Sequence, residues 1–204
     1  MKRPLVAILR GVRPEEAEGI VDVLIESGMT AIEIPLNSPD PFRSIEIAVK
    51  KAPAEILIGA GTVLTTEAVE RLNDVGGRLM VSPNVDPAVI ASARQRGMVT
   101  MPGVFTATEA LLAAKSRASA LKFFPAGILG ASGISAIRAV LPADLMIAAV
   151  GGISDRNFGE YTRAGIYAFG LGTSLYKPGM TAAEVADRAK ATIRAYDAAM
   201  QEAK

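Results

Sequence analysis

Short apolar runs alternate with longer amphipathic stretches along the whole chain. Successive runs begin about 20 to 25 residues apart. This alternation is typical of βαβ units, in which helices connect the strands of a parallel sheet. The pattern predicts eight strands, at Leu5–Leu9, Ala31–Ile34, Ile56–Gly59, Leu79–Val81, Val99–Met101, Ala120–Phe124, Met146–Val150 and Ala168–Gly170.

Residues with capping preferences mark several of the intervening helices. Thr65 and Ser154 stand where helices should begin, and glycines stand where helices should stop, at positions 28, 76, 97 and 165. The predicted helices include Pro14–Ser27, Thr65–Val75, Pro87–Arg96, Ala107–Lys115, Ser154–Arg163 and a closing helix, Thr181–Lys204.

Eight evenly spaced units favour a closed (β/α)8 TIM barrel, with an open doubly wound sheet as the alternative. The 204 residues are near the lower end of the size range for such a barrel. No repeat, linker or low-complexity segment interrupts them, so we expect one domain over residues 1–204. The first apolar run, Leu5–Leu9, is too short for a signal peptide or a membrane span. We therefore expect a soluble cytoplasmic protein with no membrane partner.

Composition removes several kinds of chemistry. The chain has no cysteine and no histidine, which excludes disulfides, thiolate nucleophiles, Ser-His-Asp triads and the metal sites that use these side chains. The 22 basic and 21 acidic residues give a formal charge of +1, which does not support a nucleic-acid partner. Acid–base work must fall to Glu, Asp, Lys or Tyr, and no clustered acidic motif indicates a metal.

Two of the predicted strands carry a single ionisable residue among apolar neighbours. These are Glu33 in the second strand and Lys122 in the sixth. An isolated charge there is costly unless it is paired or functional. Strands of the same parity supply the same interior layers of a barrel, so we expect the two side chains to meet. A strand-tip residue that reaches water and a buried ion pair both remain alternatives.

Lys122 and Glu33 together predict imine chemistry. Burial lowers the pKa of a lysine, and the free amine can then attack a ketone to form a Schiff base. The protonated imine withdraws electrons from the adjacent carbon–carbon bond, so the reaction requires neither a metal nor a cofactor. A carboxyl group must move protons between water, the carbinolamine and the substrate hydroxyl, and Glu33 can supply it.

Glycines and polar residues end several other strands. Gly151 and Gly152 follow the seventh strand, and Gly172 and Thr173 follow the eighth. Barrels frequently bind phosphate in these two loops, where glycines admit the backbone and N–H groups at a helix N-terminus hold the charge. Tight turns alone are the alternative. Arg10 follows the first strand and can fork onto a carboxylate, although a solvated loop arginine is equally compatible with the sequence.

Five motifs carry a resemblance to a known family. They are Glu33–Pro39 (EIPLNSP), Gly59–Val63 (GAGTV), Ser82–Asn84 (SPN), Leu121–Pro125 (LKFFP) and Val150–Gly152 (VGG). In this combination and order, the chain resembles the KDPG/KHG aldolase family. The resemblance runs from about Leu5 to the final helix.

The resemblance implies a (β/α)8 barrel that forms homotrimers without a metal and cleaves a phosphorylated 2-keto-3-deoxy sugar acid to release pyruvate. Lys122 would be the Schiff-base residue and Glu33 the acid–base. The pyruvate half of the substrate would meet Arg10 and Thr62. The phosphate would meet Gly152, Gly172 and Thr173, the last standing where relatives commonly have serine.

Two positions bear on the choice of sugar acid. Asn37 and Val150 stand where gluconate-type relatives commonly have an arginine and a threonine. Asn37 cannot clamp a carboxylate as a charged fork, which leaves that role to Arg10, and Val150 has no hydroxyl. We therefore expect relaxed selectivity, with the galactonate-derived substrate processed at least as well as its gluconate epimer.

Two other functions remain to be weighed. A phosphate-binding barrel isomerase or synthase would share the glycines, but such enzymes usually rely on carboxylate pairs, histidine or a metal. A catalytically silent sensor of a phosphorylated sugar acid would bind its ligand without turnover. Pyruvate release would distinguish an aldolase from both.

Overall fold

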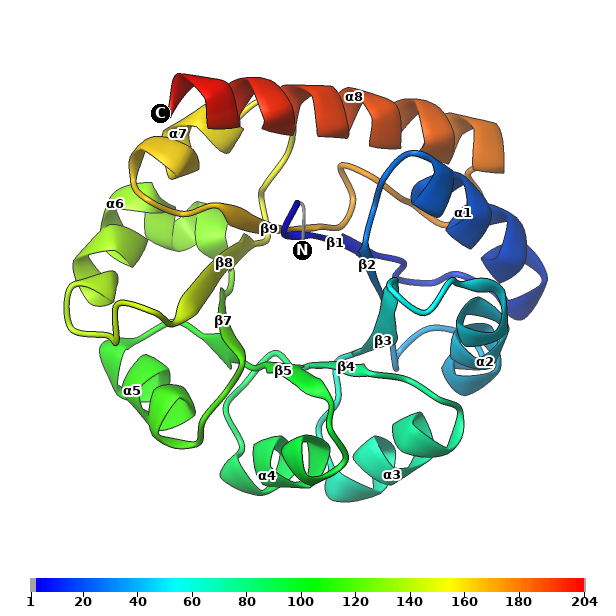
Figure 1. The fold of residues 1–204 in the computed structure, drawn as a ribbon, viewed down its shortest axis with the longest axis horizontal. Helices are drawn as coiled ribbons and strands as arrows, with labels where there is room; N and C mark the ends of the chain where they lie inside the picture. Colours follow the sequence, from blue (N-terminus) through cyan, green and yellow to red (C-terminus); the bar gives the residue numbers. More distant parts are fainter. Residues whose placement is uncertain (1–2, 204) are drawn as a thin grey trace.

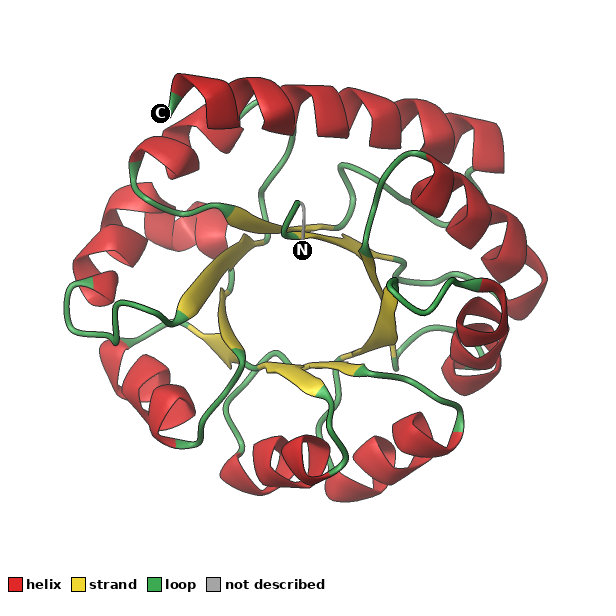
Figure 2. Cartoon of the chain, viewed as in Figure 1, coloured by secondary structure: helices red, strands yellow, loops and turns green. Residues whose placement is uncertain are grey.

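A ring of parallel strands surrounded by helices is formed by residues 3–203, which the computed structural model describes (Figures 1 and 2). The strands follow the order β5-β4-β3-β2-β1-β9-β8-β7-β6. Their bounds are β1 Leu5–Ile8, β2 Ala31–Pro35, β3 Leu57–Gly61, β4 Leu79–Val81, β5 Val99–Met101, β6 Gly103–Val104, β7 Ala120–Phe123, β8 Met146–Val150 and β9 Ala168–Leu171. The predicted barrel class is confirmed.

The fifth predicted strand continues beyond Met101 and is broken at Pro102. β5 pairs with β4, whereas β6 pairs with β7, so the two segments together close the ring. Proline has no N–H to donate to a ladder, but its carbonyl still accepts. The N–H of Lys122 donates to the Pro102 carbonyl at 2.9 Å. Gly103, two positions beyond the end of the predicted strand, therefore belongs to the sheet.

Helices alternate with the strands and cover the outside of the ring. Two of them, α2 and α6, fill intervals for which no helix was named from the sequence. The bounds are α1 Pro14–Glu26, α2 Pro41–Lys51, α3 Thr66–Asp74, α4 Pro87–Gln95, α5 Ala107–Lys115, α6 Ala126–Arg138, α7 Phe158–Arg163 and α8 Ala182–Glu202. Across the described residues, no helix combines the length and apolar character needed to cross a membrane.

Most of the predicted helix ends are confirmed. The hydroxyl of Thr65 accepts from the Ala68 N–H at 3.2 Å and caps α3. The four glycines predicted to stop helices, at positions 28, 76, 97 and 165, have φ between 72° and 97°, which glycine adopts most readily. Thr181 caps α8, while Lys204 at its predicted end lies outside the described residues.

The predicted start of a helix at Ser154 is wrong, because α7 begins at Phe158. The Ser154 N–H donates to Oδ1 of Asn157 at 2.9 Å, and the Ser154 hydroxyl accepts from the N–H of Arg156. These local side-chain bonds favour a turn over a helix.

The core positions the functional end of the barrel. One apolar cluster fills the space between strands and helices. A second lies among the strands of the ring and contains Val6, Ala31, Leu79, Val81, Met101, Ala120, Ala148 and Ala168. Side chains of this cluster fill the middle of the ring. The open space inside the ring therefore lies at the carboxyl ends of the strands.

Candidate functional site

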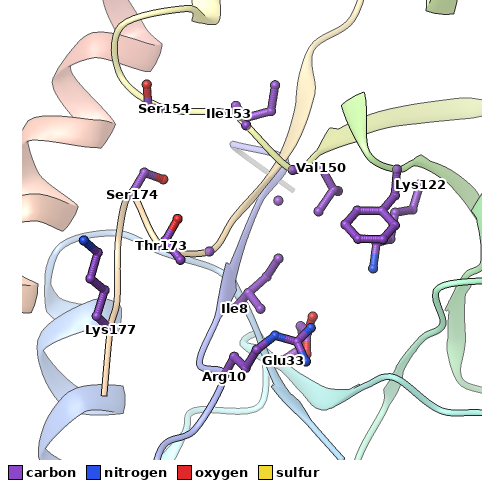
Figure 3. A pocket seen from close by; sticks show the side chains of 15 residues that line it. Ile8, Arg10, Glu33, Lys122, Val150, Ile153, Ser154, Thr173, Ser174 and Lys177 are labelled. Atoms are coloured by element: carbon purple, nitrogen blue, oxygen red, sulfur yellow. The ribbon is translucent and has the colours of Figure 1, made fainter. Parts of the chain in front are cut away.

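A cavity of about 420 Å³ lies at the carboxyl ends of the strands (Figure 3). Barrel chemistry is found at this face. Seven of the eight predicted site residues line the cavity: Arg10, Glu33, Lys122, Gly151, Gly152, Gly172 and Thr173. The chain therefore brings together residues that are up to 163 positions apart in the sequence, which is the separation of Arg10 and Thr173.

Strand periodicity explains why Glu33 and Lys122 face inward. Side chains two positions apart in a strand point to the same face. Ala31 and Ala120 belong to the apolar cluster inside the ring. Glu33 and Lys122 each follow one of these alanines by two positions, on β2 and β7, so their side chains enter the space directly above that cluster.

Thr62 is the predicted site residue that does not line the cavity. β3 extends to Gly61, two positions beyond its predicted end, and Thr62 follows with φ 57°, an uncommon conformation for a β-branched residue. The next residue is anchored to β4, because the Val63 N–H donates to the Val81 carbonyl at 3.1 Å. The position next to Glu33 is consequently taken by Gly61.

Glu33 is a buried carboxyl group without a hydrogen-bonded partner on one oxygen. Its side chain is 2% exposed, and within residues 3–203 its Oε2 atom has no partner. Burial raises the pKa of Glu33 to about 7, while the positive charges of Lys122 and Arg10 oppose this rise. A carboxyl group with this pKa can both donate and accept a proton near neutral pH.

Lys122 is also removed from solvent, with 6% of the residue exposed. Burial lowers its pKa, Arg10 lowers it further, and the negative charge of Glu33 opposes both effects. The Nζ atom lies 4.7 Å from the centre of the Phe124 ring, which covers one side of the amine and favours its protonated form in part. Desolvation is the largest influence on this pKa, so at a given pH a larger fraction of Lys122 is in the free-amine form than for an ordinary lysine.

The two groups influence each other through space but do not form a salt bridge within the described part of the chain. A closely paired carboxylate would hold the lysine in its charged form. The structure thus does not support the interpretation of Glu33 and Lys122 as only a buried ion pair. It leaves both side chains open to the same cavity (Figure 3).

Gly61 provides the space for the Glu33 carboxyl group. A Cβ atom at position 61 would lie 2.0 Å from Oε2 and 2.4 Å from Cδ of Glu33. Both distances are far shorter than van der Waals contact. Any side chain at this position would displace the carboxyl group, so Gly61 sets the position of Glu33.

Gly61→Ala is expected to lower turnover roughly 10- to 100-fold, because a displacement of the acid–base group by about 1 Å is costly. The fold should persist, since the carboxyl group is the movable end of a side chain. Steady-state kinetics, with the melting temperature and the pH profile, would check this. Gly19→Ala is the matched control, because its Cβ would meet nothing within 4 Å. An unchanged turnover in Gly61→Ala would mean that Glu33 tolerates displacement.

Arg10 extends from the end of β1 and is held by a neighbouring loop. Its guanidinium donates to the Oδ1 atom of Asn37, and the Gly11 N–H donates to the Ser38 hydroxyl at 2.9 Å. These contacts join the loops after β1 and β2. Arg10 therefore lies beside Glu33 at one end of the cavity (Figure 3), and its positive charge lowers the pKa of both Glu33 and Lys122.

The glycine loops form the other end of the cavity. Gly151 and Gly152 have φ of 90° and 83°, so both positions require glycine. The Gly151 carbonyl accepts from the Gly127 N–H at 2.8 Å, which fixes the loop against α6. A Cβ atom on Gly172 would meet nothing within 4 Å, so this position faces open space.

The turn after β9 presents polar groups to this end. Within residues 3–203, the N–H groups of Thr173 and Ser174 have no acceptor, whereas Arg188 of α8 donates to the Thr173 carbonyl at 3.3 Å. Free N–H groups beside flexible glycine are the donors that suit a bound anion. They belong to a turn, not to the helix N-terminus that was expected here.

Sequence reasoning assigned no site role to several residues of the lining. Five of them are Ile8, Phe124, Ile153, Ser174 and Lys177. Lys177 carried a signal that was available, since it is a cation in the loop after the last strand, where barrels often bind phosphate. The apolar members carried none, because they look like ordinary core residues.

Known proteins resemble this chain over nearly its full length. The family model "KDPG and KHG aldolase" matches residues 1–193. A probable 2-dehydro-3-deoxy-6-phosphogalactonate aldolase of Rhizobium meliloti (strain 1021) is 73% identical over 198 residues, covering 97% of this chain and 93% of that protein. The 2-dehydro-3-deoxy-6-phosphogalactonate aldolase of Escherichia coli (strain K12) is 44% identical over 200 residues, covering 98% of each.

One solved structure contains a chain with a similar fold. That chain forms a cube-shaped, highly porous protein cage designed by fusing symmetric oligomeric domains. The alignment has a TM-score of 0.97 and 43% identity, and it covers 99% of this chain and 75% of the cage chain.

Proposed function

The chain belongs to the KDPG and KHG aldolase family and is a carbon–carbon lyase, and from this premise we propose that it cleaves 2-dehydro-3-deoxy-6-phosphogalactonate into pyruvate and glyceraldehyde 3-phosphate. Lys122 is the Schiff-base residue and Glu33 the acid–base in this proposal. The observation that carries it is a buried amine and a buried carboxyl group that open to one cavity without an ion pair between them.

The reaction begins at the Lys122 amine. Its lone pair attacks the C2 carbonyl of the substrate, and loss of water from the carbinolamine leaves a protonated imine. The C3–C4 bond then breaks, and its electrons move into the imine to form an enamine. Glyceraldehyde 3-phosphate leaves, the enamine takes a proton at C3, and water releases pyruvate and the free amine. No electron acceptor outside the substrate is needed.

Glu33 moves the protons in this sequence. It donates a proton to the departing hydroxyl of the carbinolamine, accepts one from the C4 hydroxyl as the carbon–carbon bond breaks, and acts in reverse during hydrolysis. A pKa of about 7 suits both directions, since neither protonation state is strongly disfavoured at neutral pH. Arg10 binds the carboxylate of the pyruvate half in this proposal, whereas Thr62, which does not line the cavity, is given no contact with it.

The substrate phosphate occupies the opposite end of the cavity. Gly151, Gly152 and Gly172 admit it close to the backbone, and the free N–H group and hydroxyl of Thr173 donate to it. Residues of this end and the Lys122–Glu33 pair line one and the same cavity (Figure 3). A single extended sugar acid can therefore contact both ends. Pyruvate release from 2-dehydro-3-deoxy-6-phosphogalactonate by the purified protein tests the function. Ligand binding without pyruvate release would indicate a sensor instead.

The same assay with both phosphorylated epimers tests selectivity. The epimers differ at C4, whose hydroxyl must be recognised by nearby groups. Val150 lines the cavity at the end of β8 and packs against Gly170, where a Cβ atom would lie 2.7 Å from Cγ2 of Val150. Having no hydroxyl, it offers the C4 group no hydrogen bond. We expect the galactonate-derived epimer to react at least as well as the gluconate-derived one.

Val150→Thr is expected to raise the gluconate-to-galactonate ratio of kcat/KM by up to about tenfold, because one hydrogen bond contributes about 0.5–1.5 kcal/mol. Val150→Ala is the control, since it changes the size of the side chain without adding a hydroxyl. The same ratio in both variants would place the selectivity elsewhere in the cavity.

We also propose that the chain acts as a cytoplasmic homotrimer. The solved cage, whose chain contains a domain of the same fold, was designed by fusing symmetric oligomeric domains. On this chain, large apolar side chains are exposed on the neighbouring helices α5 and α6, namely Leu111, Leu112 and Ile128. Exposed apolar groups of this kind favour contact between subunits.

A further inference from the structure

We propose that Lys177 determines the preference for a phosphorylated substrate by pairing with the phosphate dianion. The inference rests on the proposed function and adds a residue to its phosphate end. Three cationic side chains line the cavity within residues 3–203: Arg10, Lys122 and Lys177. The positive charge of Arg10 lowers the pKa of both Lys122 and Glu33. Arg10 and Lys122 therefore both lie at the end of the cavity where the imine forms.

Lys177 stands at the opposite end of the cavity. Figure 3 shows it beside Thr173 and Ser174 and well separated from Lys122. Its backbone follows the turn after β9, and its own N–H group donates to Sδ of Met180 at 3.3 Å. The next residue, Pro178, packs against Gly11, where a Cβ atom would lie 2.7 Å from Cγ of Pro178. The base of the side chain is therefore fixed relative to the cavity.

The ammonium group of Lys177 is available to a ligand. The residue is exposed, and no carboxylate in the described part of the chain forms an ion pair with it. A ligand that pairs with it does not have to displace an existing partner. A phosphate monoester carries a charge of about −1.5 to −2 at pH 7, so it is a strong partner for a free cation.

The neutral donors at this end favour a charged phosphate over a neutral hydroxyl less strongly than a full positive charge does. Backbone N–H groups and hydroxyls bind many oxygen acceptors, including an uncharged substrate hydroxyl. A lysine favours an anion, and its interaction grows as the phosphate loses its second proton. Because Lys177 is exposed, salt should screen this interaction. Preference for phosphate should therefore depend on both pH and salt through this one side chain.

Lys177→Met tests the proposal, because it keeps an unbranched side chain only one atom shorter and removes the charge. We expect kcat/KM for the phosphorylated substrate to fall roughly 10-fold, mainly through a higher KM, as for loss of one ion pair to phosphate. For the dephosphorylated substrate, kcat/KM should change less than about twofold. Lys177→Arg should restore most of the loss. Lys115→Met, an exposed lysine in the last turn of α5, is the matched control.

Salt separates a charge effect from a structural one. Raising the ionic strength from roughly 0.02 M to 0.5 M should lower kcat/KM of the wild type more than that of Lys177→Met, because the Debye length shortens over this range. Equal salt dependence, an unchanged KM, or an equal loss with the dephosphorylated substrate would overturn the proposal.

Two measurements keep this inference separate from the proposed function. Borohydride trapping of pyruvate involves no phosphate and should be the same in the wild type and Lys177→Met. Titration with inorganic phosphate involves no catalysis and should give a Kd roughly 10-fold higher in Lys177→Met. If the wild type released no pyruvate, the proposed aldolase function would fail, and the phosphate titration would still decide the role of Lys177. Equal Kd values would reject it.

Discussion

Lys122→Arg is expected to abolish aldol cleavage, lowering turnover by roughly 10⁴-fold or more, as for loss of a catalytic nucleophile. A guanidinium remains protonated at every relevant pH and cannot attack the substrate ketone. The wild-type lysine differs because burial lowers the pKa of its amine. The variant carries a positive charge on a side chain of similar length, so the loss cannot be attributed to a missing cation.

Chemical trapping tests the same assignment directly. Borohydride in the presence of pyruvate should reduce the imine and add one pyruvyl group to the peptide that contains Lys122. Lys122→Arg should show no such addition, while Lys115→Arg on α5 should be labelled like the wild type. Labelling of a different lysine in the wild type would remove Lys122 from the mechanism, even if its substitution reduced the rate.

Glu33→Gln is expected to lower kcat by about 100-fold or more, because glutamine keeps the shape of the side chain but cannot exchange a proton as an acid–base. Formation of the imine precedes cleavage of the carbon–carbon bond, so measuring it separates the acid–base role of Glu33 from a role in binding. Pyruvate should still bind, whereas formation of the trapped imine should slow along with turnover. A rate near that of the wild type would leave Glu33 with a structural role alone.

The same substitution should increase stability at high pH. The pKa of Glu33 rises from an ordinary 4.5 to about 7 in the folded protein. Between these values the folded state binds more protons than the unfolded state, so the free energy of unfolding decreases as the pH rises through this window. Glutamine removes this loss, which corresponds to about 2–3 kcal/mol.

Urea denaturation at pH 5 and pH 8 would measure the effect as a gain for Glu33→Gln over the wild type that is larger at pH 8. Glu109→Gln provides a control of opposite sign. Its carboxylate accepts from the N–H groups of Phe105 and Thr106, each at 2.8 Å, and its substitution should destabilise the protein at both pH values. Equal gains for Glu33→Gln at the two pH values would show that burial of its charge carries no pH-dependent cost.

Local patterns in the sequence were enough to predict the barrel and most of its elements. The two-residue period of the strands places Glu33 above Ala31 and Lys122 above Ala120, so a lone charge in each run already indicates an inward side chain. Caps such as Thr65 act over three or four residues and are readable in the same way. Where a local bond was overlooked, as at Ser154 and Asn157, the predicted helix start was wrong.

Contacts between residues that are far apart in the sequence were decided only by the tertiary structure. That Gly61 lies against the carboxyl group of Glu33 depends on the register of β2 and β3, in which Pro35 pairs with Gly61. That Lys177 reaches the glycine end of the cavity depends on how Pro178 packs against Gly11. No local pattern contains either distance.

The sequence by itself determined which residues carry charge into the apolar interior, because side-chain direction in a strand follows from position alone. Only the tertiary structure decided their ionisation and their partners. The pKa of Glu33 rises because the closed ring excludes water from it, and the opposing charges of Lys122 and Arg10 come from other parts of the chain and form no ion pair with it. Desolvation and Coulomb energy depend on distances in space, which a closed barrel sets between residues far apart in the chain.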